Sequence, residues 1–91
     1  MEIFDYAQDR DSAAKFLLWR ERHPDGLVIN CRGNALTLHV AHCGHFTFKV
    51  TDDVNLTLSK KVCSLDRQEL ETWAHGQSTK ALRRCRSCNP G

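Results

Sequence analysis

The sequence predicts a small α+β domain, in which an antiparallel β-sheet is flanked by two helices and followed by a C-terminal Cys-x-x-Cys zinc knuckle. Three observations predict this class. Two segments, one near each end, carry apolar residues at the spacing of an amphipathic helix. The segments between them alternate apolar and polar residues, as half-buried strands do. Five cysteines and five histidines in 91 residues supply the material for a metal site, which small domains often need as a staple.

The first helix is expected to begin at Asp11 or Ser12 and to end near Arg22. Side-chain oxygens of aspartate and serine accept hydrogen bonds from the first free backbone N–H groups of a helix. The tetrapeptide HPDG follows, and its proline and glycine favour a turn. Trp19 lies outside the strict apolar stripe of this helix, so we expect it to be partly exposed. Residues 1–10 are expected to form an arm with a short extended piece.

The middle of the chain is expected to form the strands. Segments 27–30 and 35–40 enclose a turn that contains glycine and asparagine, and they favour a β-hairpin. Segment 45–50 alternates apolar and polar residues in the same way. Segment 56–65 supplies one more strand, and its two adjacent lysines are expected near an exposed edge.

The second helix is expected over residues 64–77. Asp66, followed three residues later by Glu69, has the spacing of a capping box. Gly76 lies where the C-cap of this helix is expected. A short third helix is expected to begin at Ser78 and to end at the Cys-x-x-Cys.

Length and composition favour a single cytoplasmic domain over residues 1–91. The net charge of +2 is too small to imply a partner by itself. The N-terminus lacks the basic start and apolar run of a signal peptide, and no apolar segment is long enough to span a bilayer. A reducing compartment is therefore expected. The odd number of cysteines, five, argues against a fully paired set of disulfides.

A zinc site is predicted from two separate stretches. Cys85 and Cys88 have the spacing of half a tetrahedral zinc site, because two intervening residues let a tight turn direct both sulfurs at one ion. The stretch HVAHCGH supplies the other half, with His39 and Cys43 as the preferred pair. These four ligands form a closed Cys3His site for Zn²⁺, which stabilises structure and activates no water.

Several alternatives to this ligand set stay open. Cys43 can pair with His45 instead, and Cys31 or Cys63 can replace a ligand. A free cysteine is often a small buried apolar residue, which is the simpler interpretation of Cys31 and Cys63. The Cys-x-x-Cys also occurs as a redox motif, although it then usually opens a helix beside a βαβ unit.

The ordered stretches DGLVIN, LTLHVAHCGHF, KVCS with ELETWA, and CRSC resemble a group of small, uncharacterised bacterial zinc-binding domains. The resemblance covers most of the chain, from Pro24 to Pro90. It implies the same ligand set, namely His39, Cys43, Cys85 and Cys88. It also implies that Cys63 is a core or near-site residue, and it singles out Asp25, Gly26 and Asn30. Such domains look similar to modules that accompany restriction and other DNA-processing genes.

The basic C-terminal segment predicts the partner. We expect a non-catalytic module that contacts nucleic acid through cationic side chains, since phosphate contacts dominate such affinity; the candidates are Lys80, Arg83, Arg84, Arg86, Lys60 and Lys61. The alternative is a protein–protein interaction or accessory module in a bacterial defence or DNA-processing system, which an exposed Trp19 would favour. No enzyme and no membrane partner are expected. The sequence offers no paired carboxylates, nucleophile elbow or phosphate-cradling glycine loop.

Overall fold

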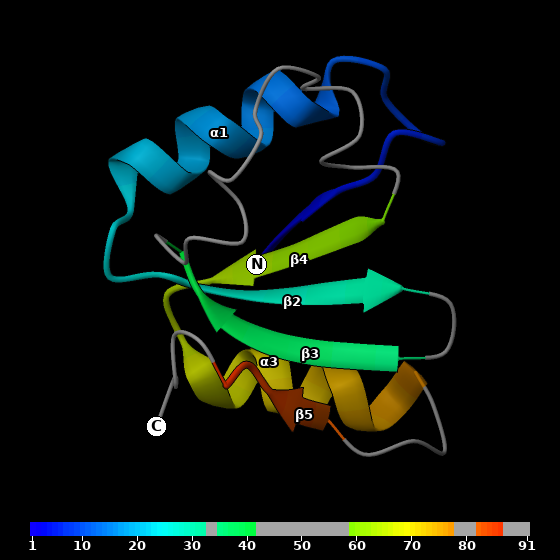
Figure 1. Ribbon diagram of the computed structural model, residues 1–91, viewed down its shortest axis with the longest axis vertical. Coiled ribbons are helices and arrows are strands. Elements are labelled where there is room, and N and C mark those ends of the chain that lie inside the picture. Colours follow the sequence, from blue (N-terminus) through cyan, green and yellow to red (C-terminus); the bar gives the residue numbers. More distant parts are fainter. Residues whose placement is uncertain (33–34, 42–58, 78–81, 87–91) are drawn as a thin grey trace.

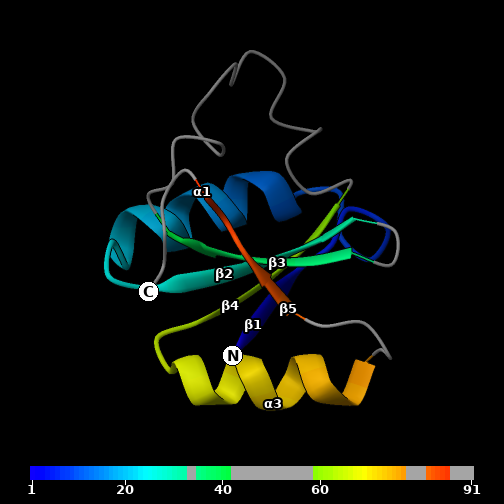
Figure 2. The same ribbon diagram turned by 60° about the horizontal axis from the view of Figure 1, so that its bottom comes forward.

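The computed structural model describes residues 1–32, 35–41, 59–77 and 82–86 (Figure 1). In these residues the chain forms one five-stranded sheet with a helix on each face, as Figure 2 shows edge-on. The elements are β1 (Glu2–Phe4), α1 (Ser12–Arg22), β2 (Leu27–Arg32), β3 (Ala35–Val40), β4 (Lys60–Ser64), α3 (Arg67–Gln77) and β5 (Leu82–Arg84). The α+β class is confirmed. No helix in this part of the chain is long and apolar enough to cross a membrane.

The sheet is mixed, with strand order β1-β4-β2-β3-β5. The first four strands pair antiparallel as expected, whereas β5 runs parallel to β3. The prediction of a third helix that ends at the Cys-x-x-Cys is wrong for residues 82–84, because these residues form β5. Helix propensity is a weak preference, and here pairing with β3 overrides it. The strand expected over 45–50 and the end of the knuckle lie outside the described residues.

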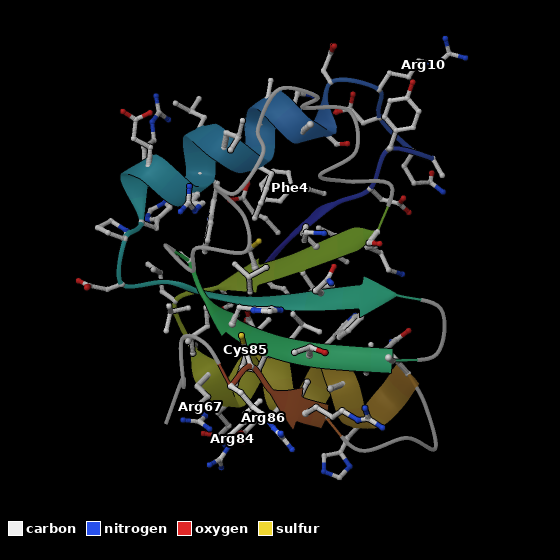
Figure 3. The ribbon with its side chains drawn as sticks, in the orientation of Figure 1. Phe4, Arg10, Arg67, Arg84, Cys85 and Arg86 are labelled. Carbon is white, nitrogen blue, oxygen red and sulfur yellow. The ribbon has the colours of Figure 1, made fainter. Side chains whose placement is uncertain are left out.

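One core lies between α1 and the sheet. Ala13, Phe16 and Trp19 of α1 are buried at intervals of three residues, so one stripe of the helix faces the strands. Figure 3 shows Phe4 directed from β1 towards α1, where its ring lies 5.8 Å from that of Phe16. Trp19 belongs to this core and is only 7% exposed, so the expectation of partial exposure is wrong. The buried residues of this α1-side core are Phe4, Phe16, Trp19, Val28, Ala41, Cys63 and Cys85.

The second core lies between α3 and the opposite face of the sheet. Leu70 and Ala74, one helical turn apart, are the buried residues of α3. They pack on apolar side chains from three strands. The buried residues of this α3-side core are Ile29, Leu36, Leu38, Val62, Leu70 and Ala74.

The expected capping residues at the start of α3 are connected by consecutive hydrogen bonds. The Gln68 N–H donates to Asp66 Oδ1 at 3.0 Å, which satisfies one free group of the first turn. The Asp66 N–H donates to Ser64 Oγ, and the Ser64 hydroxyl donates to Glu69 Oε1, both at 2.9 Å. The Met1 ammonium also contacts Glu69, and these two donors lower the pKa of Glu69. The capping box is therefore closed through the Ser64 hydroxyl.

Gly26 is expected to tolerate no side chain, because a Cβ there would lie 2.5 Å from Trp19 Cη2 and 3.0 Å from the His23 carbonyl oxygen. Overpacking of this kind costs about 1–3 kcal/mol. Gly26→Ala should lower the free energy of unfolding by that amount in a urea titration. Gly76→Ala is the matched control, since no heavy atom lies within 4 Å of its Cβ position. It should raise stability by up to about 1 kcal/mol through helix propensity. Equal effects of the two substitutions would contradict the packing of Trp19 on Gly26.

Candidate metal-binding and nucleic-acid-binding site

The parallel pairing of β3 and β5 brings together two of the predicted zinc ligands. In this pairing Leu38 lies opposite Arg84, and the Cys85 N–H donates to the Leu38 carbonyl oxygen at 2.9 Å. The next position along both chains places His39 opposite Cys85. Neighbouring strands lie about 4.8 Å apart, so the two residues are adjacent across the sheet.

His39 and Cys85 also share one face of the sheet. Cys85 packs in the α1-side core, and His39 pairs with Val28, whose side chain lies in the same core. Figure 3 shows Cys85 where the chain leaves β5 beside β3. Both side chains are 5% exposed, and Nδ1 of His39 is buried. His39 and Cys85 are therefore two buried residues at neighbouring positions on one face of the sheet, and their side chains have donor atoms of the kinds that zinc prefers.

The remaining predicted ligands, Cys43 and Cys88, and the alternative His45 lie outside the described residues. Within residues 1–32, 35–41, 59–77 and 82–86, no group of three or more His, Cys, Asp or Glu side chains is placed to hold a metal ion. The described residues thus supply one pair of the four predicted ligands.

The alternative cysteine ligands do not meet His39. Cys31 packs against the α3-side core, which is on the opposite face of the sheet. Cys63 shares the face of His39, but Val28 on β2 stands between them in the register. Burial raises the pKa of both thiols, which opposes the thiolate form that binds metals. Cys63 fits the interpretation of a small buried side chain, whereas Cys31 is partly buried against the α3-side core.

Three of the predicted cationic residues lie at the β5 edge of the sheet. Arg83, Arg84 and Arg86 are exposed there, and Lys80 lies outside the described residues. Leu82 packs on the α3-side core and Cys85 on the α1-side core. Because strand side chains alternate, Arg83 projects on the α1 side and Arg84 on the α3 side.

Lys61 is not at an exposed edge, contrary to expectation. β1 pairs with β4 on the side away from β2, so β4 is an inner strand. The Lys61 side chain is 4% exposed, and its Nζ donates to Asn30 Oδ1 at 2.7 Å and to the Ser59 carbonyl oxygen at 2.9 Å. Burial lowers the pKa of Lys61 to about 8. Lys60 lies on the α3 side, where its Nζ is 5.7 Å from the Trp73 ring centroid. Lys61 is therefore not among the solvent-exposed cationic residues that could contact nucleic acid.

The contact between Lys61 and Asn30 was not predicted. A signal for it exists in two of the stretches that carry the resemblance, because Asn30 ends DGLVIN and Lys61 begins KVCS. Asn30 lies opposite Lys61 in the β2–β4 register, so the motifs meet across neighbouring strands. Comparisons of this chain with protein-family models, with curated proteins and with solved structures found no match.

Proposed function

We propose that this domain is a non-catalytic zinc-binding module that contacts nucleic acid through the basic edge formed by β5. The proposed ligands are His39, Cys43, Cys85 and Cys88. Four protein ligands close the coordination shell of Zn²⁺, so the ion stabilises the fold and has no open position for a reacting water.

The observation that carries the metal proposal is the β3–β5 pairing. This pairing ends at Leu38 and Arg84, so His39 and Cys85 follow at neighbouring positions on one face of the sheet. Cys43 follows His39 by four residues, and Cys88 follows Cys85 by three. Each described ligand therefore has its proposed partner within a few residues along the chain, which is the arrangement of zinc sites built from two ligand pairs.

The distribution of charge supports the nucleic-acid proposal. The sheet order places β1 and β5 at opposite edges. Arg83, Arg84 and Arg86 are exposed at the β5 edge, whereas Glu2 and Asp5 belong to the opposite end of the sheet order. Positive charge concentrated on one edge attracts a polyanion in a defined orientation, although the net charge is only +2.

A binding titration with fluorescein-labelled DNA, single-stranded and duplex, tests the proposal. The affinity of the wild-type domain should fall steeply between 50 and 200 mM salt, and replacement of Arg83, Arg84 and Arg86 by alanine should weaken binding at least about tenfold. The matched control replaces Arg10, Lys15 and Arg22, which belong to α1 and the segment before it rather than to β5, and which carry the same formal charge. It should keep affinity within about threefold. Equal losses in the two triple variants would refute the basic edge.

A second candidate is a protein-interaction module. The buried Trp19 removes the feature that favoured it, but Met1, Ile3 and Leu65 are 53%, 48% and 63% exposed. Met1 and Leu65 line one cleft beside β1. Exposed apolar side chains that are close together are typical of protein-binding surfaces. Lack of any DNA binding by the wild-type domain at low salt would favour this second candidate.

A further inference from the structure

A row of hydrogen-bond donors crosses the α1 face of the sheet. Asn30 on β2 pairs with Thr37 on β3, and Thr37 pairs with Arg83 on β5. The residue before each along its strand belongs to or packs on the α3-side core, as Ile29, Leu36 and Leu82 do, so the row itself projects on the α1 side. We call Asn30, Thr37 and Arg83 the donor row.

The donor row lies beside the proposed metal ligands. His39 follows Thr37 by two positions, and Cys85 follows Arg83 by two, so each ligand is on the same face as the donor-row residue that precedes it on its strand. Two residues of a strand span about 6.6 Å. A metal ion held by His39 and Cys85 would therefore fix the relative positions of Thr37 and Arg83.

Lys61 fixes which atoms of Asn30 remain available. An ammonium group has donors only, so the amide of Asn30 must direct its oxygen at Lys61 Nζ, which lies 2.7 Å away. The amide nitrogen, with two donors, is thereby turned away from Lys61. Asn30 is half-buried and Lys61 is buried, so the surrounding residues keep the Asn30 amide in this orientation.

The chemistry of the row favours an anionic ligand. Asn30 presents amide N–H groups, Thr37 presents a hydroxyl, and Arg83 presents an exposed guanidinium. The strand spacing of about 4.8 Å distributes these donors over about 10 Å. The full row across the sheet, which continues through Lys61 to Phe4, contains no acidic residue.

We infer that the donor row binds phosphates of the nucleic-acid backbone, so that the nucleic acid lies across the α1 side of the β5 edge. This inference rests on the proposed function and specifies which face of the edge is used. Polar and cationic side chains supply most phosphate contacts in protein–nucleic acid complexes. Arg84, on the other side of the same strand, then contributes its charge to the basic edge but is not one of the donors of the row.

The test compares Arg83→Ala with Arg84→Ala, which remove the same charge from the same strand on opposite faces. Binding of fluorescein-labelled single-stranded and duplex DNA is measured between 50 and 200 mM salt. Arg83→Ala should weaken binding about fivefold and reduce the salt slope by about 0.7–0.9, the loss of one phosphate contact. Arg84→Ala removes only part of the general charge of the basic edge, so it should weaken binding about twofold, which is less than Arg83→Ala does. Asn30→Asp, which exchanges the amide donors for a carboxylate, should weaken binding about tenfold, and Thr37→Val about twofold to threefold.

The outcomes distinguish failure of this inference from failure of the proposed nucleic-acid-binding function. Equal losses for Arg83→Ala and Arg84→Ala would overturn the assignment of the face, while the basic edge would stand. Unchanged affinity of a folded Asn30→Asp variant would overturn the role of Asn30. Absence of wild-type binding at 50 mM salt would overturn both the donor row and the nucleic-acid function. Thermal unfolding of each variant identifies losses of affinity that arise from misfolding. If Asn30→Asp does not fold, Thr37→Val, whose side chain is nearly isosteric with that of threonine, tests the donor row instead.

Discussion

Removal of zinc from the purified domain is expected to unfold it. Structural zinc in small peptides contributes about 10–16 kcal/mol of apparent binding free energy, which is folding free energy because the unfolded chain has no formed site. A domain typically has only about 5–15 kcal/mol of net stability, so loss of this contribution exceeds what packing can replace. Circular dichroism during titration with a chelator should show cooperative loss of structure, and added zinc should restore it.

Ligand variants give this prediction its controls. His39→Ala and Cys85→Ser should each lose stoichiometric zinc in metal analysis and unfold at lower temperature. Cys31→Ser should keep its zinc, because Cys31 packs on the α3 side of the sheet. A chelated domain with an unchanged spectrum, or a His39→Ala variant with full zinc content, would show that the His39–Cys85 pair is not a metal site.

The helices could be predicted because their signals are local. The expected first helix, from Asp11 or Ser12 to about Arg22, matches α1, and the expected second helix includes α3, which ends at Gln77. The capping residue Asp66 was identified from spacing alone. The alternation of apolar and polar residues likewise predicts a strand over residues 35–40, and β3 spans these residues. Each of these features depends on residues within one or two turns of the chain.

The features that were missed depend on tertiary contacts. Trp19 is buried because Gly26 leaves room for its ring, and no periodicity within α1 carries that information. Lys61 is buried because β1, sixty residues earlier in the chain, takes the edge of the sheet beside β4. The parallel strand β5 follows from pairing with β3, whereas its own sequence contains good helix formers.

For the candidate site, residue types and their spacing predict that His39 and Cys85 belong to one site, although the segment before Cys85 is expected to be helical. The structure places them at adjacent positions across β3 and β5. The donor row could not be predicted in the same way. Which of Arg83 and Arg84 faces α1 is set by the register of β5, which the sequence alone does not define.

Lys61 is expected to make stability rise with pH in the alkaline range. Burial lowers its pKa from the ordinary 10.5 to about 8 in the folded protein. Between these values the unfolded chain holds a proton that the folded chain has lost. The free energy of unfolding therefore increases with pH, because it increases wherever the unfolded state binds more protons. The increase attributable to Lys61 should be about 1 kcal/mol between pH 8 and 9 and about 2–3 kcal/mol by pH 10.

Urea titrations from pH 7 to 10 on the wild type and on Lys61→Met isolate this contribution. The raised pKa values of Cys31 and Cys63 act in the opposite direction, since their buried thiols keep protons that the unfolded chain loses above pH 9. Both thiols are present in the variant, so they cancel in the difference between the two proteins. The stability of the wild type relative to Lys61→Met should therefore grow as pH rises above 8. A difference that is flat across this range would show that the ammonium of Lys61 is as well solvated in the folded protein as in the unfolded chain, and that its hydrogen bonds to Asn30 and Ser59 do not hold it in a dry environment.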